Sequence, residues 1–266
     1  MVVRVAGAKR KYIEAAYNLL ARDGLEGVSI RKVADEIGCS STALYRHFPD
    51  VDKLIAVASV RFLRDYISNA RILSKVDLNP MELNLQLWEC LAYYSFRDAD
   101  VFENMFFSDA SGKMYSEALA EYFSVYPEDL DGLRDFMLDM VRNATIVERD
   151  SILLGRAVEM GMLSEKSADY LCRLDSYLYR GMLTSLSGCK PSDREFREST
   201  LEFMQLMIRS YTTQLEEGYS ILVVNSDFDV AAAGNAPASQ LRKSFRVEVT
   251  VVPCGGAIPS KGKATA

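Results

Sequence analysis

The chain has 266 residues and a mass of 29.8 kDa, enough for one large domain or for a small domain joined to a larger one. Apolar residues make up 49% of it and charged residues 26%, a composition that is ordinary for globular proteins and excludes wholesale disorder. The formal net charge of −6 excludes a uniformly basic nucleic-acid-binding protein, although it allows a local basic face.

The sequence lacks the features of membrane, secreted and metal-binding proteins. No apolar run approaches the roughly 18 residues of a membrane span, and the first residues have no signal-peptide core. The five cysteines are scattered without a CxxC pair, which is typical of reduced thiols, so we expect a cytoplasmic protein. The single histidine, His47, excludes a site in which several histidines bind a metal, and we expect no cofactor.

Charge is distributed unevenly along the chain. The first 64 residues carry a net charge of +4 and the remainder carries −10. Four basic residues without an acid stand at the start: Arg4, Lys9, Arg10 and Lys11. A basic end on an acidic body favours an anionic partner for the N-terminus. This start is either an arm that reaches DNA or a flexible, solvated terminus.

Three short helices are predicted within residues 1–50. Apolar side chains repeat at the i, i+3, i+4, i+7 spacing of a helix in two segments: Ile13, Ala16, Tyr17 and Leu20, and then Ile30, Val33, Ala34 and Ile37. Ser29 can cap the second helix and Ser40 the third, which we expect over residues 41–48. These two helices are joined by a short turn with Gly38 and match a helix-turn-helix motif.

The predicted third helix begins with residues suited to reading DNA. A helix-turn-helix inserts the start of its second helix into a major groove, where side chains must be short and polar or able to contact a thymine methyl group. Ser41, Thr42 and Ala43 fit this requirement. Leu44 and Phe48 have the spacing of core residues, so the DNA-reading surface is predicted at the start of the helix.

The segment of residues 28–48 closely resembles the signature of the TetR family of transcriptional regulators. The matching parts are S-I-R-K-V-A-x-E-x-G, then S-x-x-A-L-Y-x-H-F, and then the D-K-L that begins the next helix. The resemblance covers residues 9–55. It implies a homodimer that places one recognition helix from each subunit in successive major grooves of double-stranded operator DNA.

The resemblance also implies roles for individual residues. Ser41, Thr42 and Ala43 occupy the base-reading start of the recognition helix. Tyr45 and His47 match positions that usually contact phosphate.

Two further positions match the family, and one departs from it. Ser29 and Arg31 match the start of the second helix, where a hydroxyl and backbone amides meet phosphate and the arginine can reach a base. Where the family usually reads x-N-K after the phenylalanine, this chain reads P-D-V, so Val51 replaces a common phosphate-binding lysine and Asp50 adds a like charge. Either Lys53 compensates one turn later, or the affinity for DNA is modest.

From residue 52 onward the pattern predicts a helical body. A long fourth helix, with Leu54, Ala58 and Phe62 on one face, would connect the head to the body as a lever. The Asn-Pro pair at residues 79–80 marks the next helix start, because proline is favoured at the first helical position.

The remaining predicted helices fill the chain to residue 217. They are expected near residues 80–96, 99–108, 112–125, 128–160, 164–187 and 192–217. We expect the helix over 128–160 to break near Asp150 or Gly155. Ser192 and Glu195 form a capping box for the last one.

Aromatic residues are concentrated in one stretch of the body. Residues 88–126 hold 11 of the chain's 27 aromatic residues. Together with nearby methionines they form either an adaptable ligand cavity or only a packed core. The resemblance also implies a ligand site in the body, so we expect a cavity for a small apolar or aromatic effector. Its expected lining residues are Trp88, Tyr93, Phe106, Tyr122, Phe136 and Met140.

Apolar stripes on the last two helices favour a homodimer interface. One stripe is Leu171, Leu174, Leu178, Gly181 and Met182, and the other is Phe196, Phe203, Met207 and Tyr211. Two such helices from each subunit would form a four-helix bundle. The alternative is that these stripes complete the core of the monomer.

The end of the chain differs from the rest. Residues 221–224 and 245–252 are β-prone, but a two-stranded hairpin alone is marginally stable, so we expect a disordered or loosely docked tail. We therefore predict an all-α fold in three parts: a helix-turn-helix DNA-binding domain (residues 1–50), a helical effector-binding and dimerisation domain (51–217), and an extension (218–266).

The leading functional hypothesis is a ligand-responsive repressor that binds operator DNA as a homodimer and is released by its effector. The alternative is a DNA-binding regulator without a small-molecule effector, controlled by a protein partner or acting as an activator. An enzyme is disfavoured, because the sequence has no Gly-rich phosphate loop, metal-ligand cluster or nucleophile–base spacing. No membrane partner is expected.

Overall fold

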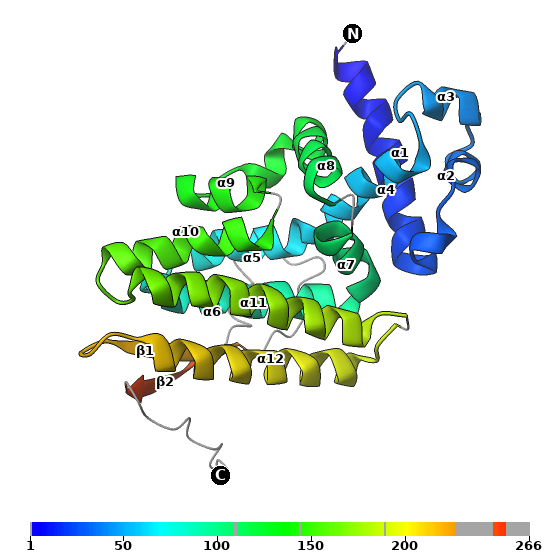
Figure 1. Ribbon diagram of the computed structural model, residues 1–266. Coiled ribbons are helices and arrows are strands. Elements are labelled where there is room, and N and C mark those ends of the chain that lie inside the picture. The colour runs from blue at the N-terminus through cyan, green and yellow to red at the C-terminus, as the bar shows by residue number, and fades with distance from the viewer. Residues whose placement is uncertain (1, 109–110, 144, 189, 227–246, 254–266) are drawn as a thin grey trace.

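The computed structural model describes residues 2–108, 111–143, 145–188, 190–226 and 247–253. Within these ranges the fold is all-α, as predicted: twelve α-helices, three short 3-10 turns and one two-stranded ribbon. Figure 1 shows a small group of helices from the start of the chain set beside a larger helical body. No helix in the described part of the chain has the length and apolar character needed to cross a bilayer.

The head contains α1 (Val2–Asp23), α2 (Ile30–Glu36) and α3 (Ser41–Tyr45). The apolar face of α1 is completely covered, with Ile13 and Ala16 at 0% exposure. The 3-10 turn η1 (Leu25–Gly27) follows Gly24, whose φ of +71° favours glycine. The third helix is shorter than the predicted residues 41–48, because the chain forms a turn after Tyr45.

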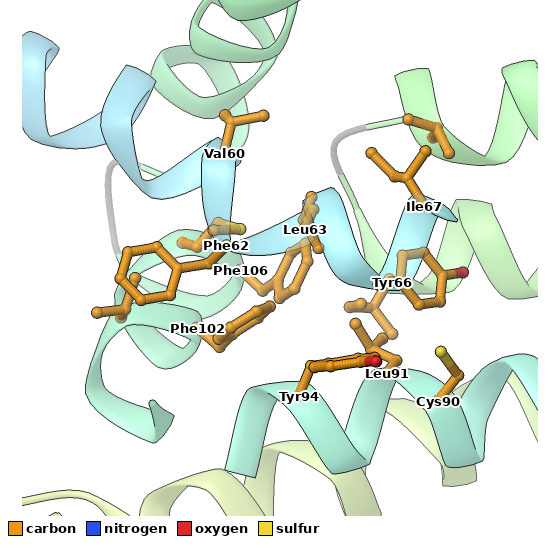
Figure 2. Close-up of a cluster of buried hydrophobic side chains, with 14 of the residues drawn as sticks. Val60, Phe62, Leu63, Tyr66, Ile67, Cys90, Leu91, Tyr94, Phe102 and Phe106 are labelled. Carbon is orange, nitrogen blue, oxygen red and sulfur yellow. The ribbon is translucent and has the colours of Figure 1, made fainter. Parts of the chain in front are cut away.

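The predicted fourth helix is two helices joined by a tighter turn. It comprises α4 (Val51–Val60), the 3-10 turn η2 (Arg61–Leu63) and α5 (Arg64–Leu73). Figure 2 shows Phe62, Leu63 and Tyr66 from this segment among buried side chains that include Leu91 and Phe102. The rings of Phe62 and Phe102 meet edge to face, with centroids 6.4 Å apart. This segment therefore connects the head to the core of the body.

The helix α6 (Pro80–Arg97) is the centre of the body. Every residue from Pro80 to Phe96 is buried, as expected of a helix surrounded by others. Asn79 accepts hydrogen bonds from the backbone of Met81 and Glu82 and completes a capping box with the Glu82 side chain, so the predicted start is confirmed. The neighbours of α6 include α5, α10 (Ile146–Glu159) and α12 (Asp193–Gln214).

The prediction of a helix over residues 128–160 with a break near Asp150 or Gly155 is wrong. After α7 (Ala99–Phe107) and α8 (Ser111–Val125), the chain forms η3 (Pro127–Leu130), α9 (Asp135–Arg142) and then α10. A turn with Gly132 at φ +75° separates η3 from α9. Thr145 caps α10 by accepting a 3.2 Å hydrogen bond from the backbone of Glu148. Asp150 and Gly155, where the break was expected, lie inside α10.

The last two helices, α11 (Glu165–Leu186) and α12, lie close to their predicted positions, and Ser192 and Glu195 form the predicted capping box. The predicted interface stripe on α12 is buried within the monomer, which favours the alternative stated above for that helix, whereas on α11 only Leu171 is buried and the rest of the stripe is partly or fully exposed. Residues 171, 196, 203, 207 and 211 are at most 3% exposed. These buried residues fit the monomer core because their faces turn toward α6 and toward each other.

The two β-prone segments form a ribbon. Strands β1 (Ser220–Ser226) and β2 (Val247–Pro253) pair antiparallel, with Ser220 opposite Pro253 and Ser226 opposite Val247. The start of β1 lies near α6 and α12. The predicted disorder of the tail concerns residues 227–246 and 254–266, which lie outside the described residues.

Candidate DNA-binding surface and body cavity

The helix-turn-helix has a fixed scaffold. The turn between α2 and α3 passes through Gly38 at φ +67°, a conformation that glycine adopts without strain. Ser29 accepts a 3.2 Å hydrogen bond from the backbone of Lys32 at the start of α2, and Ser40 accepts one of 3.3 Å from Ala43 at the start of α3. Leu44 is completely buried, as is Phe48, so α3 is held from beneath.

The predicted base-reading and phosphate-binding residues are placed on this scaffold at the surface. Thr42 is exposed, and Ser41 and Ala43 are partly exposed. Tyr45 is 55% exposed, which is unusual for so large an aromatic side chain in a monomer, and the Arg31 side chain is 89% exposed. Figure 1 shows α2 and α3 on the far side of α1 from the body, where a duplex has access to them.

Two other predicted contacts also have structural roles. The hydroxyl of Ser29 is the N-cap of α2, so it positions the backbone amides at that helix start. His47 is half-buried, and its ring lies against that of Tyr12, with centroids 5.2 Å apart. The α1 helix therefore orients the only histidine of the chain.

The departure from the family pattern at residues 50 and 51 has a structural explanation. Asp50 is the N-cap of α4 and accepts a 2.7 Å hydrogen bond from the backbone of Lys53. Val51 packs partly against the core. The ammonium group of Lys53 lies 3.2 Å from Glu117 and 3.8 Å from Glu121, both on α8. A phosphate contact by Lys53 would therefore compete with these two carboxylates.

The basic start of the chain is neither a free arm nor an unstructured terminus. It is the first part of α1, and two of its basic side chains bind the body. Lys9 forms a 2.6 Å ion pair with Glu121, and Arg10 donates hydrogen bonds to the carbonyl of Val125 and to Glu128. Lys11 is exposed, and the side chain of Arg4 lies outside the described residues.

A cavity in the body contains two of the six predicted ligand-binding residues. It is lined by Tyr66, Asn84, Leu87, Trp88, Leu91, Met140, Ile146, Arg149 and Asp150. Trp88 and Met140 are therefore brought together. The centre of a water molecule can occupy about 20 Å³ of the cavity, which is room for roughly one water. A larger ligand would have to move its walls.

The other four predicted ligand-binding residues lie elsewhere in the core. Tyr93 packs edge to face on Phe196. Phe106 contacts several rings and lies under the guanidinium of Arg149, and Phe136 lies under that of Arg156. Tyr122 donates a 2.7 Å hydrogen bond to Asp129. None of the four lines the cavity.

A buried polar network borders this cavity, and sequence reasoning missed it. Trp88 and Asn84 on α6 donate hydrogen bonds of 2.8 and 2.6 Å to Oδ1 of Asp150 on α10. Asn84 also donates to the hydroxyl of Tyr211 on α12, which in turn donates to Oδ2 of Asp175 on α11. The network thus joins four helices. Asp150 and Asp175 are 2% and 0% exposed, and their carboxyl groups lie close enough to interact; we call them the aspartate pair.

Burial sets the protonation of the aspartate pair. Loss of water around the carboxyl raises the pKa of Asp150, although hydrogen bonds from Asn84 and Trp88 oppose the shift. Burial raises the pKa of Asp175 further, and the nearby charge of Asp150 acts in the same direction. Both shifts favour the protonated form of the carboxyl group, most strongly at Asp175. Among the described residues, no group of three or more His, Cys, Asp or Glu side chains is arranged to hold a metal ion.

The comparison with protein families bears on the head. The sequence model described as "Bacterial regulatory proteins, tetR family" matches residues 13–58, which include α2, α3 and most of α4. This segment of the chain is therefore similar to bacterial regulatory proteins of the tetR family. The match lies in the segment whose motif resembles the TetR signature, and the TetR helix-turn-helix comprises α2 and α3.

Solved structures with similar folds also include TetR regulators, at low sequence identity. FadR of Thermus thermophilus, solved with lauroyl-CoA, is 15% identical over 76% of this chain and 94% of its own, with a TM-score of 0.49. RolR in complex with resorcinol is 15% identical over 79% and 94%, with a TM-score of 0.49. SmeT, the repressor of the Stenotrophomonas maltophilia efflux pump SmeDEF, is 12% identical over 79% and 91%, with a TM-score of 0.46. No curated protein sequence matches the chain.

Proposed function

We propose that this chain is a TetR-type repressor that binds operator DNA as a homodimer and leaves it when a small effector occupies the body cavity. The observation that carries the proposal is the outer surface of the head. There Arg31, Thr42 and Tyr45 are exposed, and capped helix starts and a covered apolar face hold them in place. Exposed polar and aromatic side chains on a rigid helix-turn-helix suit insertion into a major groove.

Specific roles follow from where each side chain lies. Ser41, Thr42 and Ala43 would read base edges and thymine methyl groups, because they begin α3 and reach the surface. Tyr45 and His47 would contact phosphates and so set the register of the head on the duplex.

The second helix and the following segment complete the contact surface. Arg31 would reach a base or phosphate from α2, beside the phosphate-facing backbone amides that Ser29 positions. Lys53 would join only after release from its partners on α8. The DNA-binding domain would span residues 1–50, the effector and dimerisation domain 51–217, and the extension 218–266.

Dimerisation would involve the outer surfaces of α11 and α12 rather than the buried stripe of α12. Tyr170 and Tyr177 on α11 and Leu201 and Leu206 on α12 are between 42% and 73% exposed. The two tyrosines are seven residues apart and so lie on one face of α11. Exposed large apolar residues on two adjacent helices are suited to a two-fold interface with a second copy.

Effector control requires that the cavity and the head communicate. Trp88 and Asp150 border the cavity, and α6 packs on α5, which continues through η2 into α4 and the head. An effector that binds one arrangement of these helices more tightly would shift the population toward it. The dimer would leave the DNA if, in that arrangement, the spacing of its two heads no longer matched that of adjacent major grooves.

The small size of the cavity favours a second candidate function. Because it has room for only about one water molecule, the chain could be a DNA-binding regulator under the control of a protein partner. A thermal-shift screen separates the two: a small molecule that raises the melting temperature of the wild-type protein supports the first candidate.

The test of the main proposal is binding to duplex DNA from the upstream region of the gene, followed by fluorescence anisotropy over a range of salt concentrations. The wild type should bind this duplex much more tightly than a scrambled one, with affinity that falls steeply with salt. The double variant Thr42→Ala/Tyr45→Ala should lose this preference. Met160→Ala, a change at a body residue that is also 55% exposed, is the control and should bind like wild type. Equal weak binding of wild type to both duplexes would contradict the proposal.

A further inference from the structure

The aspartate pair has no compensating cation. Within the described ranges, none of the ion pairs includes Asp150 or Asp175. Two of its oxygen atoms, Oδ2 of Asp150 and Oδ1 of Asp175, are buried without a conventional donor. A single proton between them would satisfy both. Without that proton, two adjacent negative charges would remain in a site that water does not reach, which is strongly unfavourable.

The buried Arg149 also lines this cavity, but its hydrogen bonds go to backbone carbonyls and not to the aspartate pair. Arg149 precedes Asp150 on α10 and is 5% exposed. Its guanidinium donates hydrogen bonds of 2.7 and 3.3 Å to the carbonyls of Asn143 and Val141, and it lies 5.0 Å from the centre of the Phe106 ring. The hydrogen-bond donors of Arg149 therefore bind carbonyls at the connection between α9 and α10. The negative charge of the aspartate pair is left for another group to balance.

The cavity places suitable walls beside this negative charge. Asp150 is part of its lining, together with the aromatic side chains of Trp88 and Tyr66. Aromatic faces attract cations, and more strongly where water is excluded. Met140 and Ile146 complete an apolar side, and methionine adapts its shape readily. The free space fits one water-sized group, the size of an ammonium head.

We propose that the aspartate pair binds the primary ammonium group of a small apolar amine, which enters the cavity and takes the place of the shared proton. The inference rests on the proposed function, because it names the chemical class of the effector. The ammonium donates a hydrogen bond to Asp150, the member of the pair that lines the cavity, and the apolar part of the amine pushes Met140 and Ile146 apart, because the cavity alone has room for only about one water. A neutral alcohol of the same shape gains only a neutral hydrogen bond. It therefore binds about tenfold to a hundredfold more weakly.

The exchange balances in charge and atoms. The free protein holds one carboxylic acid and one carboxylate; the complex holds two carboxylates and one ammonium ion, and one proton leaves to solvent. Besides the Arg149 guanidinium on α10, the titratable groups packed against the pair are Cys172 from α11, Tyr211 from α12 and Tyr66 from α5. Burial raises the pKa of all three, so they stay neutral at physiological pH. The helix α6 contributes the neutral groups of Asn84 and Trp88.

The single tryptophan provides a direct readout. Trp88 lines the cavity and is the only tryptophan in the chain, so its fluorescence reports on this site alone. The wild-type protein is titrated with 2-phenylethylamine and with its neutral counterpart 2-phenylethanol. The amine should change the fluorescence at a concentration at least tenfold lower. Calorimetry in two buffers of different ionisation enthalpy should show release of about one proton for each amine bound.

Variants of the two aspartates test whether the amine binds at this pair. Asp150→Asn and Asp175→Asn keep the shape of the side chain, remove one charge each, and should weaken amine binding at least tenfold while binding of the alcohol stays within about twofold. Asp169→Asn, a change at an exposed residue of α11, is the control and should bind like wild type. Alcohol binding as tight as amine binding, or no proton release by the wild type, would overturn the inference even if a variant fails to fold.

The result also separates this inference from the proposed function. The effect of the amine on DNA binding is measured by anisotropy in parallel. Sequence-specific DNA binding without any amine binding would overturn the inference and leave the repressor intact. Amine binding with proton release but no change in DNA affinity would support the cation site and contradict its role as an effector site.

Discussion

The hydroxyl of Tyr211 donates a 2.7 Å hydrogen bond to Oδ2 of Asp175, and this contact joins α12 to α11 inside the core. The same hydroxyl accepts a 2.7 Å hydrogen bond from Asn84 on α6. Both partners are buried, so neither can replace the contact with bulk water. One side chain thereby satisfies two buried polar groups on two different helices.

Tyr211→Phe should therefore destabilise the protein more than an ordinary loss of a hydroxyl. It keeps the ring but leaves Asp175 and Asn84 with unsatisfied groups, so we expect a loss of about 1–3 kcal/mol in the free energy of unfolding. Urea unfolding measures it. Tyr170→Phe, at a half-exposed position of α11, should change the stability by less than about 0.5 kcal/mol. Equal effects of the two variants would show that the network does not stabilise the fold.

The aspartate pair should make stability depend on pH. Because the folded-state pKa of Asp175 is raised above the unfolded value near 3.8, its protonation stabilises the fold fully below pH 4. This contribution is lost as the pH rises from about 4 toward the folded pKa, with a slope of up to about 1.4 kcal/mol per pH unit. The melting temperature should fall with pH more steeply for the wild type than for Asp175→Asn between pH 5 and 8. Parallel curves would indicate that the pair holds no extra proton.

Asp50 should have opposite effects on stability and on DNA binding. Asp50→Ala removes the N-cap of α4 and should cost about 1 kcal/mol of stability. Asp50→Asn keeps a capping oxygen, so its stability should stay near that of wild type, while loss of the negative charge near phosphate should tighten DNA binding severalfold. Melting curves and anisotropy measure the two effects. Weaker DNA binding by Asp50→Asn would place this residue away from the DNA backbone.

The acidic residues of α8 should restrain DNA binding. The double variant Glu117→Gln/Glu121→Gln frees Lys53, as well as Lys9, from their carboxylate partners. If Lys53 then reaches a phosphate, affinity should rise and the slope of log K against log salt should steepen by about 0.9. Glu159→Gln/Glu165→Gln makes the same charge change on exposed residues of the body and serves as the control. Identical salt slopes for the two double variants would exclude a phosphate contact by Lys53.

The outer face of α11 should determine the oligomeric state. Tyr177 is 73% exposed in the monomer, and Tyr177→Glu would place a charge in the proposed two-fold interface. We expect the wild type to elute as a dimer in size-exclusion chromatography with light scattering, and the variant as a folded monomer with weakened operator binding. Met160→Glu, on another exposed apolar residue, should remain dimeric. A dimeric Tyr177→Glu would move the interface elsewhere.

Local signals in the sequence predict most of the helices correctly. Capping residues such as Asn79 and Ser192 mark helix starts because the first backbone N–H groups of a helix need hydrogen-bond acceptors. This requirement does not depend on distant contacts. The start of α10 carries such a signal too, since Thr145 is followed three residues later by Glu148. The predicted break at Gly155 relied instead on glycine propensity, which packing within a helix readily overrides.

The polar interior could not be predicted from periodicity. Asp150 and Asp175 read as solvent-facing residues of amphipathic helices, because hydrophobic patterns treat every charged residue as exposed. The apolar spacing of α12 predicts that the Tyr211 ring is buried, but nothing in the sequence predicts the hydrogen bonds of its hydroxyl. The apolar stripes of α11 and α12 were ambiguous for a similar reason: apolar spacing shows that a helix face is covered but does not identify the covering surface. Only the packing of α6, α10, α11 and α12 against one another brings these groups together.

The contact between the start of α1 and α8 has a mechanical consequence. A small domain joined to a larger one by a single helix is free to swivel around the axis of that helix. Here Arg10 and Lys9 add a second point of attachment, at Val125 and Glu121 on α8. Lys190, between α11 and α12, adds a third at the carbonyl of Ala21, so α1 is held at both ends and swivelling is suppressed. A movement of α8 by a few ångströms would then tilt the whole head, as one unit, relative to the body.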